Sequence, residues 1–301
     1  MSIGRDRSTT LHRKHGYFES TFVAMGSPCE LLARTDDGDL ARVLIDVVAG
    51  EAWRIEDKFS RYIADSVVER INSSNGEAVE VDEETANLLD FAASLFAMSD
   101  GQFDITSGVL RKAWKFDGGD RVPDGQLVKS ILDTVGWGKV DWQRPFLTMQ
   151  RGMQLDFGGI GKEYAVDKAA GLVAMKTDAS VLLNFGGDIV ASGSAGDFAG
   201  WKVGIEALQT NDNKSQRVIR LTQGALATSG DARRFILRDG VRYGHILDPT
   251  TGWPVTGAPR SVNVAADTCT QAGMLATFAM LSGKDAEKFL ESQDLQFWCQ
   301  R

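Results

Sequence analysis

Several stretches of the chain repeat apolar residues every three or four positions, which is the period of a helix that packs with one side. The longest of them spans residues 40–62, and a second spans residues 83–99 and ends at an Asp-Gly pair. Residues 162–175, which follow the glycine-rich turn, and residues 270–281 are also predicted to be helices. Four helices are therefore predicted, and the apolar sides of the first two belong to the core.

Other stretches alternate apolar and polar residues or form short apolar runs, and both patterns are typical of strands. Asp239-Gly240 lies between two such runs, and this dipeptide favours a tight hairpin turn. A strand interrupted at Met25-Gly26 is predicted near the start of the chain. The predicted strands are residues 21–32, 181–184, 201–205, 218–221 and 261–265.

Residues 155–170 are predicted to be the end of a strand, a glycine-rich turn and the first turns of a helix. Gly158, Gly159 and Gly161 lack a Cβ, so a ligand can approach the backbone, and amides at a helix start can face an anion. The turn is thus a candidate phosphate site. The same glycines are also compatible with a tight connection that has no ligand.

The length of 301 residues and a hydrophobic content of 43% allow one large domain or two closely packed lobes. Residues 1–16 are polar and basic and are predicted to form a mobile tail before a domain of residues 17–301. No apolar stretch resembles a secretory signal or a membrane span, so a cytoplasmic location is predicted.

The charge and the cysteines exclude several classes of function. There are 33 basic and 41 acidic residues, and the net charge of −8 argues against broad binding to nucleic acid or to anionic membranes. The three cysteines show no paired spacing, which speaks against a disulfide framework and against a cysteine-based zinc site.

Seven segments, taken in order, resemble the FAD:protein FMN transferase family, also called ApbE, over nearly the whole chain. The resemblance implies an α+β fold, a single compact two-lobed domain with a T-fold-like core. The segments are residues 24–27, 60–72, 101–108, 155–170, 184–188, 244–252 and 272–277.

The resemblance also implies a reaction. Members of this family use a divalent metal, Mg²⁺, to cleave FAD, release AMP and leave FMN as a phosphoester on a Thr or Ser hydroxyl of an acceptor protein. The acceptor carries a Ser/Thr-Gly-Ala-Ser/Thr motif. No complete motif of this kind is present here, so self-modification is not expected. The implied partner is a separate flavoprotein.

The family's site residues transfer to this chain one by one. Metal binding falls on the carbonyl of Gly159 and on Thr277, while His245 and Asp248 lie beside the flavin and the incoming acceptor hydroxyl. A histidine there is able to take the hydroxyl proton or to orient the hydroxyl. The implied FAD contacts are Met25, Tyr62, Gln102, Phe103, Asp104, Asp156, Lys162 and Leu247.

Three of these residues also fit purely structural roles. Met25 is the size and shape of a gap-filling core residue. Asp104 is suited, with Thr106, to capping the turn that follows it. His245 fits a strand-end position bonded to the backbone.

Two positions depart from the family pattern. The family's metal-binding Asp, four residues before Thr277, is Gly273 here, and Glu163 stands where most relatives have Gly. The loss of a carboxylate about 4 Å from a metal, at an effective dielectric constant of about 20, removes up to about 4 kcal/mol of attraction. This departure leaves two alternatives to the transferase: a flavin-binding protein with impaired or no transfer, and an FAD pyrophosphatase that gives FMN and AMP.

Overall fold

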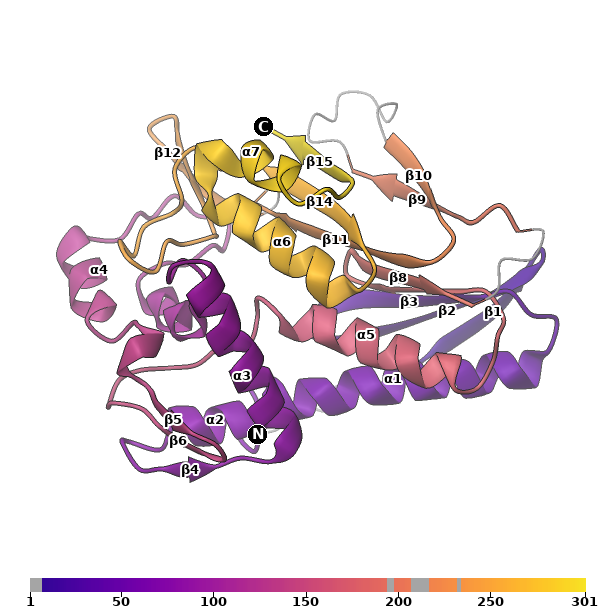
Figure 1. Ribbon diagram of the computed structural model, residues 1–301, viewed down its shortest axis with the longest axis horizontal. Helices are drawn as coiled ribbons and strands as arrows, with labels where there is room; N and C mark the ends of the chain where they lie inside the picture. The colour runs from indigo at the N-terminus through magenta and orange to yellow at the C-terminus, as the bar shows by residue number, and fades with distance from the viewer. Residues whose placement is uncertain (1–6, 194–197, 207–216, 232–233) are drawn as a thin grey trace.

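An antiparallel sheet of eight strands lies at the centre of the fold, in the order β1-β2-β3-β7-β8-β11-β14-β15 (Figure 1). The computed structural model describes residues 7–193, 198–206, 217–231 and 234–301. Every neighbouring pair in this sheet is antiparallel. Its strands are β1 (Thr10–Lys14), β2 (Tyr17–Ala24), β3 (Ser27–Ala33), β7 (Val181–Phe185), β8 (Asp188–Ser192), β11 (Gly224–Gly230), β14 (Ser261–Ala266) and β15 (Phe297–Gln300).

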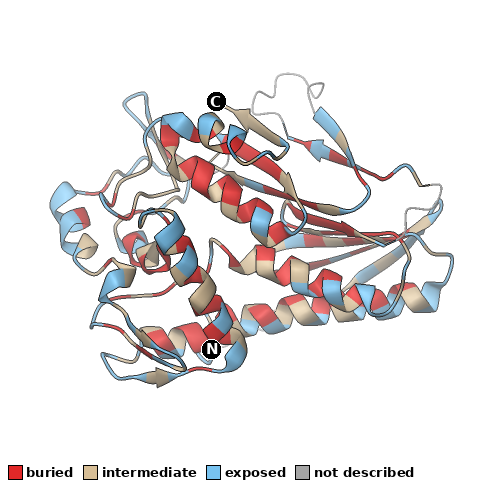
Figure 2. Ribbon diagram, in the orientation of Figure 1, coloured by how far each residue is buried: buried red, intermediate tan, exposed pale blue. Residues whose placement is uncertain are grey.

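Three helices, α1 (Gly38–Phe59), α5 (Gly161–Ala174) and α6 (Cys269–Leu281), cover one face of this sheet (Figure 1). Their apolar sides face the strands, and Figure 2 shows most of α6 buried. The hairpin of β9 (Trp201–Ile205) and β10 (Arg217–Leu221) packs its apolar side chains on a second cluster that includes Leu182 and Leu226. Both faces of the sheet therefore carry hydrophobic core.

The remaining elements form a smaller lobe beside this layer, seen at the left of Figure 1. Most of its buried apolar residues belong to the same continuous core as the sheet, while Val109, Leu110 and Val135 form a small cluster of their own. The elements of this lobe are α2 (Val67–Asn72), β4 (Val79–Glu80), α3 (Glu83–Met98), η1 (Ile105–Lys112), α4 (Gly125–Leu132), η2 (Trp137–Lys139), β5 (Asp141–Gln143) and β6 (Phe146–Thr148). The hairpin of β12 (Phe235–Arg238) and β13 (Val241–Gly244) lies at the junction of the lobes, and η3 (Gly283–Asp285) and α7 (Ala286–Glu291) follow α6.

The four predicted helices and the α+β class are confirmed. α1 begins where the Asp37 side chain accepts hydrogen bonds from Asp39 N and Leu40 N, a standard N-cap. The predicted strand over residues 21–32 is in fact a hairpin. Met25 and Gly26 both have positive φ, 52° and 67°, and this fits the tight turn between β2 and β3.

The prediction of a mobile tail over residues 1–16 is wrong for residues 10–14. These residues form β1, which pairs along its whole length with β2. β1 is an edge strand with mostly exposed side chains, so no alternating apolar pattern marks it in the sequence. Residues 1–6 lie outside the described residues. No helix within the described ranges is long and apolar enough to cross a membrane.

Candidate active site

The segment that precedes the glycine-rich turn is held by a side chain instead of a strand partner. Leu155 N donates to Asn72 Oδ1 at 2.6 Å, and Asn72 Nδ2 donates to the Leu155 carbonyl at 3.1 Å. Asp156 N donates to the Ile105 carbonyl at 2.9 Å. The prediction that a strand ends here is therefore wrong. The Asn72 amide makes the backbone hydrogen bonds that a neighbouring strand would otherwise make.

The turn itself uses three of its amides internally. Gly158 N donates to Asp156 Oδ1 at 2.8 Å, while Ile160 N and Gly161 N both donate to the Phe157 carbonyl, at 2.9 and 2.7 Å. These three amides do not point to an anion. A phosphate beside this turn would depend on side chains for most of its contacts.

Asp156 lies at the centre of a cluster of charged groups. Its Oδ2 is 3.2 Å from Arg61 Nη1 and 3.7 Å from Arg111 Nη1, and Arg61 also donates to the Gly108 carbonyl at 2.9 Å. A Cβ on Gly108 would come within 2.5 Å of Asp156 Cβ, so only glycine allows this approach. The sequence prediction included Asp156 but neither arginine, although Arg61 adjoins the predicted Tyr62.

Tyr62 projects from this cluster into solvent. Its side chain is 71% exposed, and its hydroxyl accepts a hydrogen bond from Arg111 Nη1 at 3.1 Å. The Arg61 guanidinium lies 5.1 Å from the ring centroid. The ring is thus oriented by two arginines and keeps a free surface on which a planar ligand can stack.

The three residues 102–104 have three different environments. Gln102 is exposed, whereas the Phe103 ring is buried 6.2 Å from Phe278 of α6 and touches the backbone at Gly159. Asp104 Oδ1 accepts from Thr106 N at 2.7 Å and Thr106 Oγ1 at 2.6 Å, and Asp104 Oδ2 accepts from Trp137 N at 2.8 Å. Both oxygens of Asp104 therefore serve as caps.

Met25 and the Asp188 partner of Lys162 belong to two adjoining hairpins of the central sheet. Gly186 N donates to the Pro28 carbonyl at 3.0 Å, which sets the turn before β8 against the turn that carries Met25. At the start of β8, Asp188 accepts a hydrogen bond from Lys162 Nζ at 2.5 Å. Burial opposes the charge on Lys162, but the adjacent carboxylate raises its pKa overall.

Glu163 of α5 is buried against Gly273 of α6. Its Cγ lies 2.5 Å and its Oε1 2.9 Å from the position that a Cβ on residue 273 would take. Its Oε2 is buried and has no hydrogen-bond partner within the described part of the chain. Burial, reinforced by the charge of Asp188, raises the pKa of Glu163 above its usual 4.5.

Gly159 and Thr277, the two predicted metal-binding residues, are each four positions away in sequence from one member of the Glu163–Gly273 pair. Thr277 is half-buried and lies one helical turn after Gly273, on the same side of α6. Gly159 precedes Glu163 by four residues. Its carbonyl accepts no hydrogen bond from any residue in the described ranges.

The loop of residues 245–253 packs on η1, the same element that contacts Asp156. Leu247 pairs with Pro254 and contacts the apolar side chains of η1. Trp114 Nε1 donates to the Gly252 carbonyl at 2.8 Å. Asp248 Oδ1 accepts from Thr250 N at 2.7 Å and Thr250 Oγ1 at 2.6 Å, which fixes the turn.

His245 lies at the start of this loop, with its ring edge-on to Phe116 at a centroid distance of 6.2 Å. Its Nδ1 is buried and has no hydrogen-bond partner among the described residues. Burial, together with the positive charge of Arg234, lowers the pKa of His245. The imidazole is therefore neutral near pH 7 and able to accept a proton.

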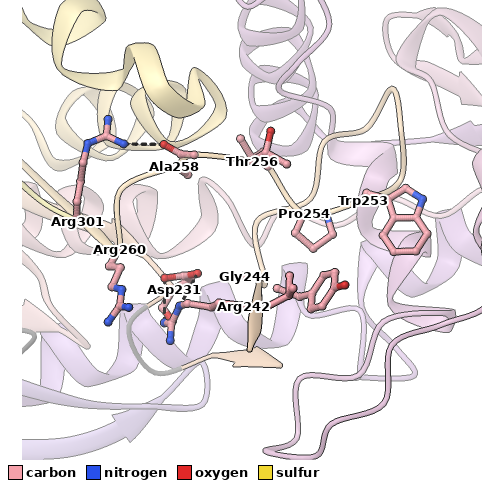
Figure 3. Close-up of a pocket in the computed structure, with 13 residues that line it drawn as sticks. Asp231, Arg242, Gly244, Trp253, Pro254, Thr256, Ala258, Arg260 and Arg301 are labelled. Atoms are coloured by element: carbon pink, nitrogen blue, oxygen red, sulfur yellow. Dashed lines mark hydrogen bonds and ion pairs between the residues drawn. The ribbon is translucent and has the colours of Figure 1, made fainter. Parts of the chain in front are cut away.

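A groove of about 560 Å³ opens beside His245, between the β12–β13 hairpin and the segment of residues 253–260 (Figure 3). Gly244, the residue before His245, lines it. Asp231 and Arg242 form an ion pair of 3.1 Å along one side, and Arg301 lies at the other end. Asp156 and Lys162 do not line this groove, so it lies on the His245 side of the candidate site.

Within the described ranges, no three His, Cys, Asp or Glu side chains lie close enough together to hold a metal ion. Magnesium often uses only one or two protein carboxylates together with substrate phosphates, and so does not require such a group. One feature fits a cation near α5 and α6: Glu163 Oε2 is buried and has no hydrogen-bond partner in the described part of the chain, and the carboxylate fills the space where a side chain on residue 273 would lie.

The fold and this site define an α+β protein in which a glycine-rich turn, an acidic and basic cluster and a histidine loop meet around η1. The model of the ApbE family matches residues 25–298, and the chain belongs to that family.

The chain is 30% identical over 236 residues to the FAD:protein FMN transferase of Vibrio cholerae, covering 77% of this chain and 71% of that protein. It is 33% identical over 238 residues to the FAD:protein FMN transferase of Treponema pallidum, covering 73% and 66%. The crystal structure of the ApbE protein of Thermotoga maritima superimposes with a TM-score of 0.83 at 31% identity, covering 94% of each chain.

Proposed function

We propose that this protein is an FAD:protein FMN transferase that moves the FMN part of FAD to a Thr or Ser hydroxyl of an acceptor protein. One observation carries the proposal. The Asp156 cluster and the His245 loop come from distant parts of the chain and both pack on η1. Together with the family assignment, this supports a site in which FAD binding and proton acceptance share one region.

The reaction is a phosphoryl transfer. The acceptor hydroxyl oxygen attacks the FMN-side phosphorus of FAD and forms a new P–O bond, and the bond from that phosphorus to the bridging oxygen breaks. AMP leaves with the bridging oxygen, and the hydroxyl proton passes to a base. The protein has to neutralise the pyrophosphate, align the hydroxyl and accept this proton.

Each of these tasks has a candidate residue. The exposed ring of Tyr62 offers a stacking surface for the isoalloxazine, and the half-buried ammonium of Lys162 beside Asp188 offers charge to the pyrophosphate. His245, neutral and at the start of the loop beside the groove, takes the proton or orients the hydroxyl. Asp248 keeps the histidine loop in shape through its bonds to Thr250.

A bound Mg²⁺ would supply charge neutralisation on the pyrophosphate oxygens. The residues that would hold it include the Gly159 carbonyl and the Thr277 hydroxyl, which lie on the two segments that meet at Glu163 and Gly273. Both are oxygen donors, the type that Mg²⁺ prefers.

The test is AMP release from FAD by the purified protein, with Mg²⁺ and an acceptor domain that carries a Ser/Thr-Gly-Ala-Ser/Thr motif. Acceptor-dependent AMP, with covalent flavin on the acceptor by mass spectrometry, is expected. An acceptor with Ala at the target hydroxyl and a chelator are the two controls, and both should abolish transfer. FAD binding without AMP, or AMP and free FMN without any acceptor, would contradict the transferase and indicate one of the two alternatives.

A further inference from the structure

The contact between Glu163 and Gly273 joins the first turn of α5 to the first half of α6. Glu163 Cγ and Cδ lie 2.5 and 3.1 Å from the position of a Cβ on residue 273. Any side chain on residue 273 would displace the Glu163 carboxylate. The Glu163 side chain therefore occupies the space where the side chain of an acidic residue at position 273 would start.

The neighbouring charged groups are already paired, whereas one oxygen of Glu163 has no partner in the described part of the chain. Lys162 and Asp188 bond to each other. Asp167, one turn further along α5, accepts hydrogen bonds from Cys269 N and Thr270 N, each at 2.8 Å, at the start of α6. Glu163 is 9% exposed, and its Oε2 has no partner within the described ranges. A buried carboxylate oxygen that lacks a hydrogen bond is costly unless a cation pairs with it.

Two further oxygen donors lie on the segments that carry this contact. The Gly159 carbonyl precedes Glu163 by four residues, and the Thr277 hydroxyl follows Gly273 by four residues on the same side of α6. One carboxylate, one carbonyl and one hydroxyl, completed by water or substrate phosphate, is a donor set suited to Mg²⁺.

We propose that Glu163 is a carboxylate ligand of the divalent cation and that Gly273 is the space that admits it. The carboxylate that the family resemblance places on α6 is thus supplied from α5. The inference rests on the proposed function only in assuming that the cation is the one used in flavin transfer. The unpartnered Oε2 and the closed space at Gly273 carry the assignment.

The direct test measures cation binding without FAD. Mn²⁺ replaces Mg²⁺ as the probe, and free Mn²⁺ is followed by electron paramagnetic resonance during titration of the full chain. Glu163→Gln keeps the shape of the side chain and removes its charge, so we expect the Mn²⁺ affinity to fall by on the order of 10²-fold. The matched control is Glu291→Gln, an exposed acid at the end of α7, which should not change the affinity. Unchanged Mn²⁺ affinity in folded Glu163→Gln would overturn the assignment.

A second variant moves the carboxylate back to α6. Glu163→Gly with Gly273→Asp exchanges the two residues and removes the steric conflict, so Mn²⁺ affinity should return to within about 10-fold of the wild type. Glu163→Gly alone should bind as weakly as Glu163→Gln. A double variant that is folded by circular dichroism and binds no better than Glu163→Gly would contradict the exchange.

A purely structural role for Glu163 has a different signature. It predicts that Glu163→Gln changes the melting temperature in chelator and leaves the Mn²⁺ affinity as it was, which is a result against the proposal. The same samples also distinguish a failure of the proposed function from a failure of the cation-ligand proposal. Mn²⁺ binding that depends on Glu163, with no AMP release from FAD, would refute the transferase and support the cation ligand. AMP release that Glu163→Gln leaves unchanged would refute the ligand and support the transferase.

Discussion

Glu163 occupies the space into which a side chain at position 273 would project, with its Cγ 2.5 Å from where that Cβ would lie. Both residues are buried, and each belongs to a helix packed on the central sheet. The residue at either position therefore limits what the other position can hold. The contact joins two helices, so it cannot be predicted from the apolar pattern of either helix alone.

The first prediction is that Gly273→Ala destabilises the protein, although Ala is the better helix former. In an open helix position the change would stabilise by about 0.5–1 kcal/mol. Here the new methyl group meets Glu163, and overpacking of this kind typically costs about 1–3 kcal/mol. Denaturant unfolding should therefore show a lower free energy of unfolding for Gly273→Ala.

The effect of Gly273→Ala on the free energy of unfolding should change sign once the Glu163 side chain is removed. In a Glu163→Ala background, Gly273→Ala should raise the free energy of unfolding, because the methyl group then fills space. A double-mutant cycle measures this coupling directly. A similar destabilisation in both backgrounds would show that the two side-chain positions do not compete.

The second prediction concerns Tyr62, whose ring is 71% exposed and so contributes little to the core. Tyr62→Ala should weaken FAD binding by about 3- to 10-fold, because an aromatic stacking contact is worth about 0.5–1.5 kcal/mol. The melting temperature should stay the same. FAD fluorescence quenching measures the affinity.

Tyr62→Phe is the matched control, because it keeps the ring and removes only the hydroxyl that binds Arg111. It should retain most of the affinity. Equal losses in the Phe and Ala variants would instead point to the Arg111 contact, and no loss in either would remove Tyr62 from the FAD site.

The four long helices α1, α3, α5 and α6 could be predicted, and in α1 and α3 an apolar side is the reason. α1, for example, begins at Gly38 and ends at Phe59, close to the predicted residues 40–62. β1 could not be predicted, because an edge strand is held by backbone bonds to β2 and needs no apolar side chains.

The candidate site was less accessible to prediction, because its contacts join segments far apart in the chain. Asn72 holds the backbone of Leu155, and Arg61 reaches both Asp156 and the Gly108 carbonyl. The sequence offers the residue types for such contacts but not the pairings. The FAD and metal roles assigned from the family resemblance stay predictions until binding is measured.

The third prediction is a pH dependence set by His245. Burial and the charge of Arg234 lower its pKa from the usual 6.5, so the acid limb of kcat/KM should have its midpoint below pH 6.5. The neutral form is the base, so activity should rise with pH through this limb and then level off. His245→Gln should lower the rate by about 10²- to 10⁴-fold and remove the limb.

His12→Gln is the control for this experiment, because His12 is exposed in the edge strand β1. It should leave both the rate and the profile unchanged. An acid limb that persists in His245→Gln would assign the titration to another group and remove His245 as the base.

The fourth prediction concerns Glu84, which ties three helices together. Its carboxylate accepts hydrogen bonds from Arg54 and Lys58 of α1, at 2.7 and 2.6 Å, and from the Tyr164 hydroxyl of α5, at 2.8 Å. The hydrogen bond from Arg54 is the main cause that lowers the pKa of Glu84 below its usual 4.5. Glu84→Gln should cost about 1–2 kcal/mol in the free energy of unfolding at neutral pH, since partial exposure screens these bonds.

The sign of the pH effect follows from the lowered pKa. The carboxylate stabilises the fold fully above the unfolded pKa near 4.5, and this contribution is lost as the pH falls toward the lower folded pKa. The difference in unfolding free energy between wild type and Glu84→Gln should therefore shrink from pH 7 to about pH 3. Glu83→Gln is the matched control, because Glu83 is the adjacent acid on α3, its side chain is 80% exposed and it pairs with Arg144 at the surface. A cost of Glu84→Gln that does not change with pH, or one that Glu83→Gln shares, would show that the charge of Glu84 does not hold α1, α3 and α5 together.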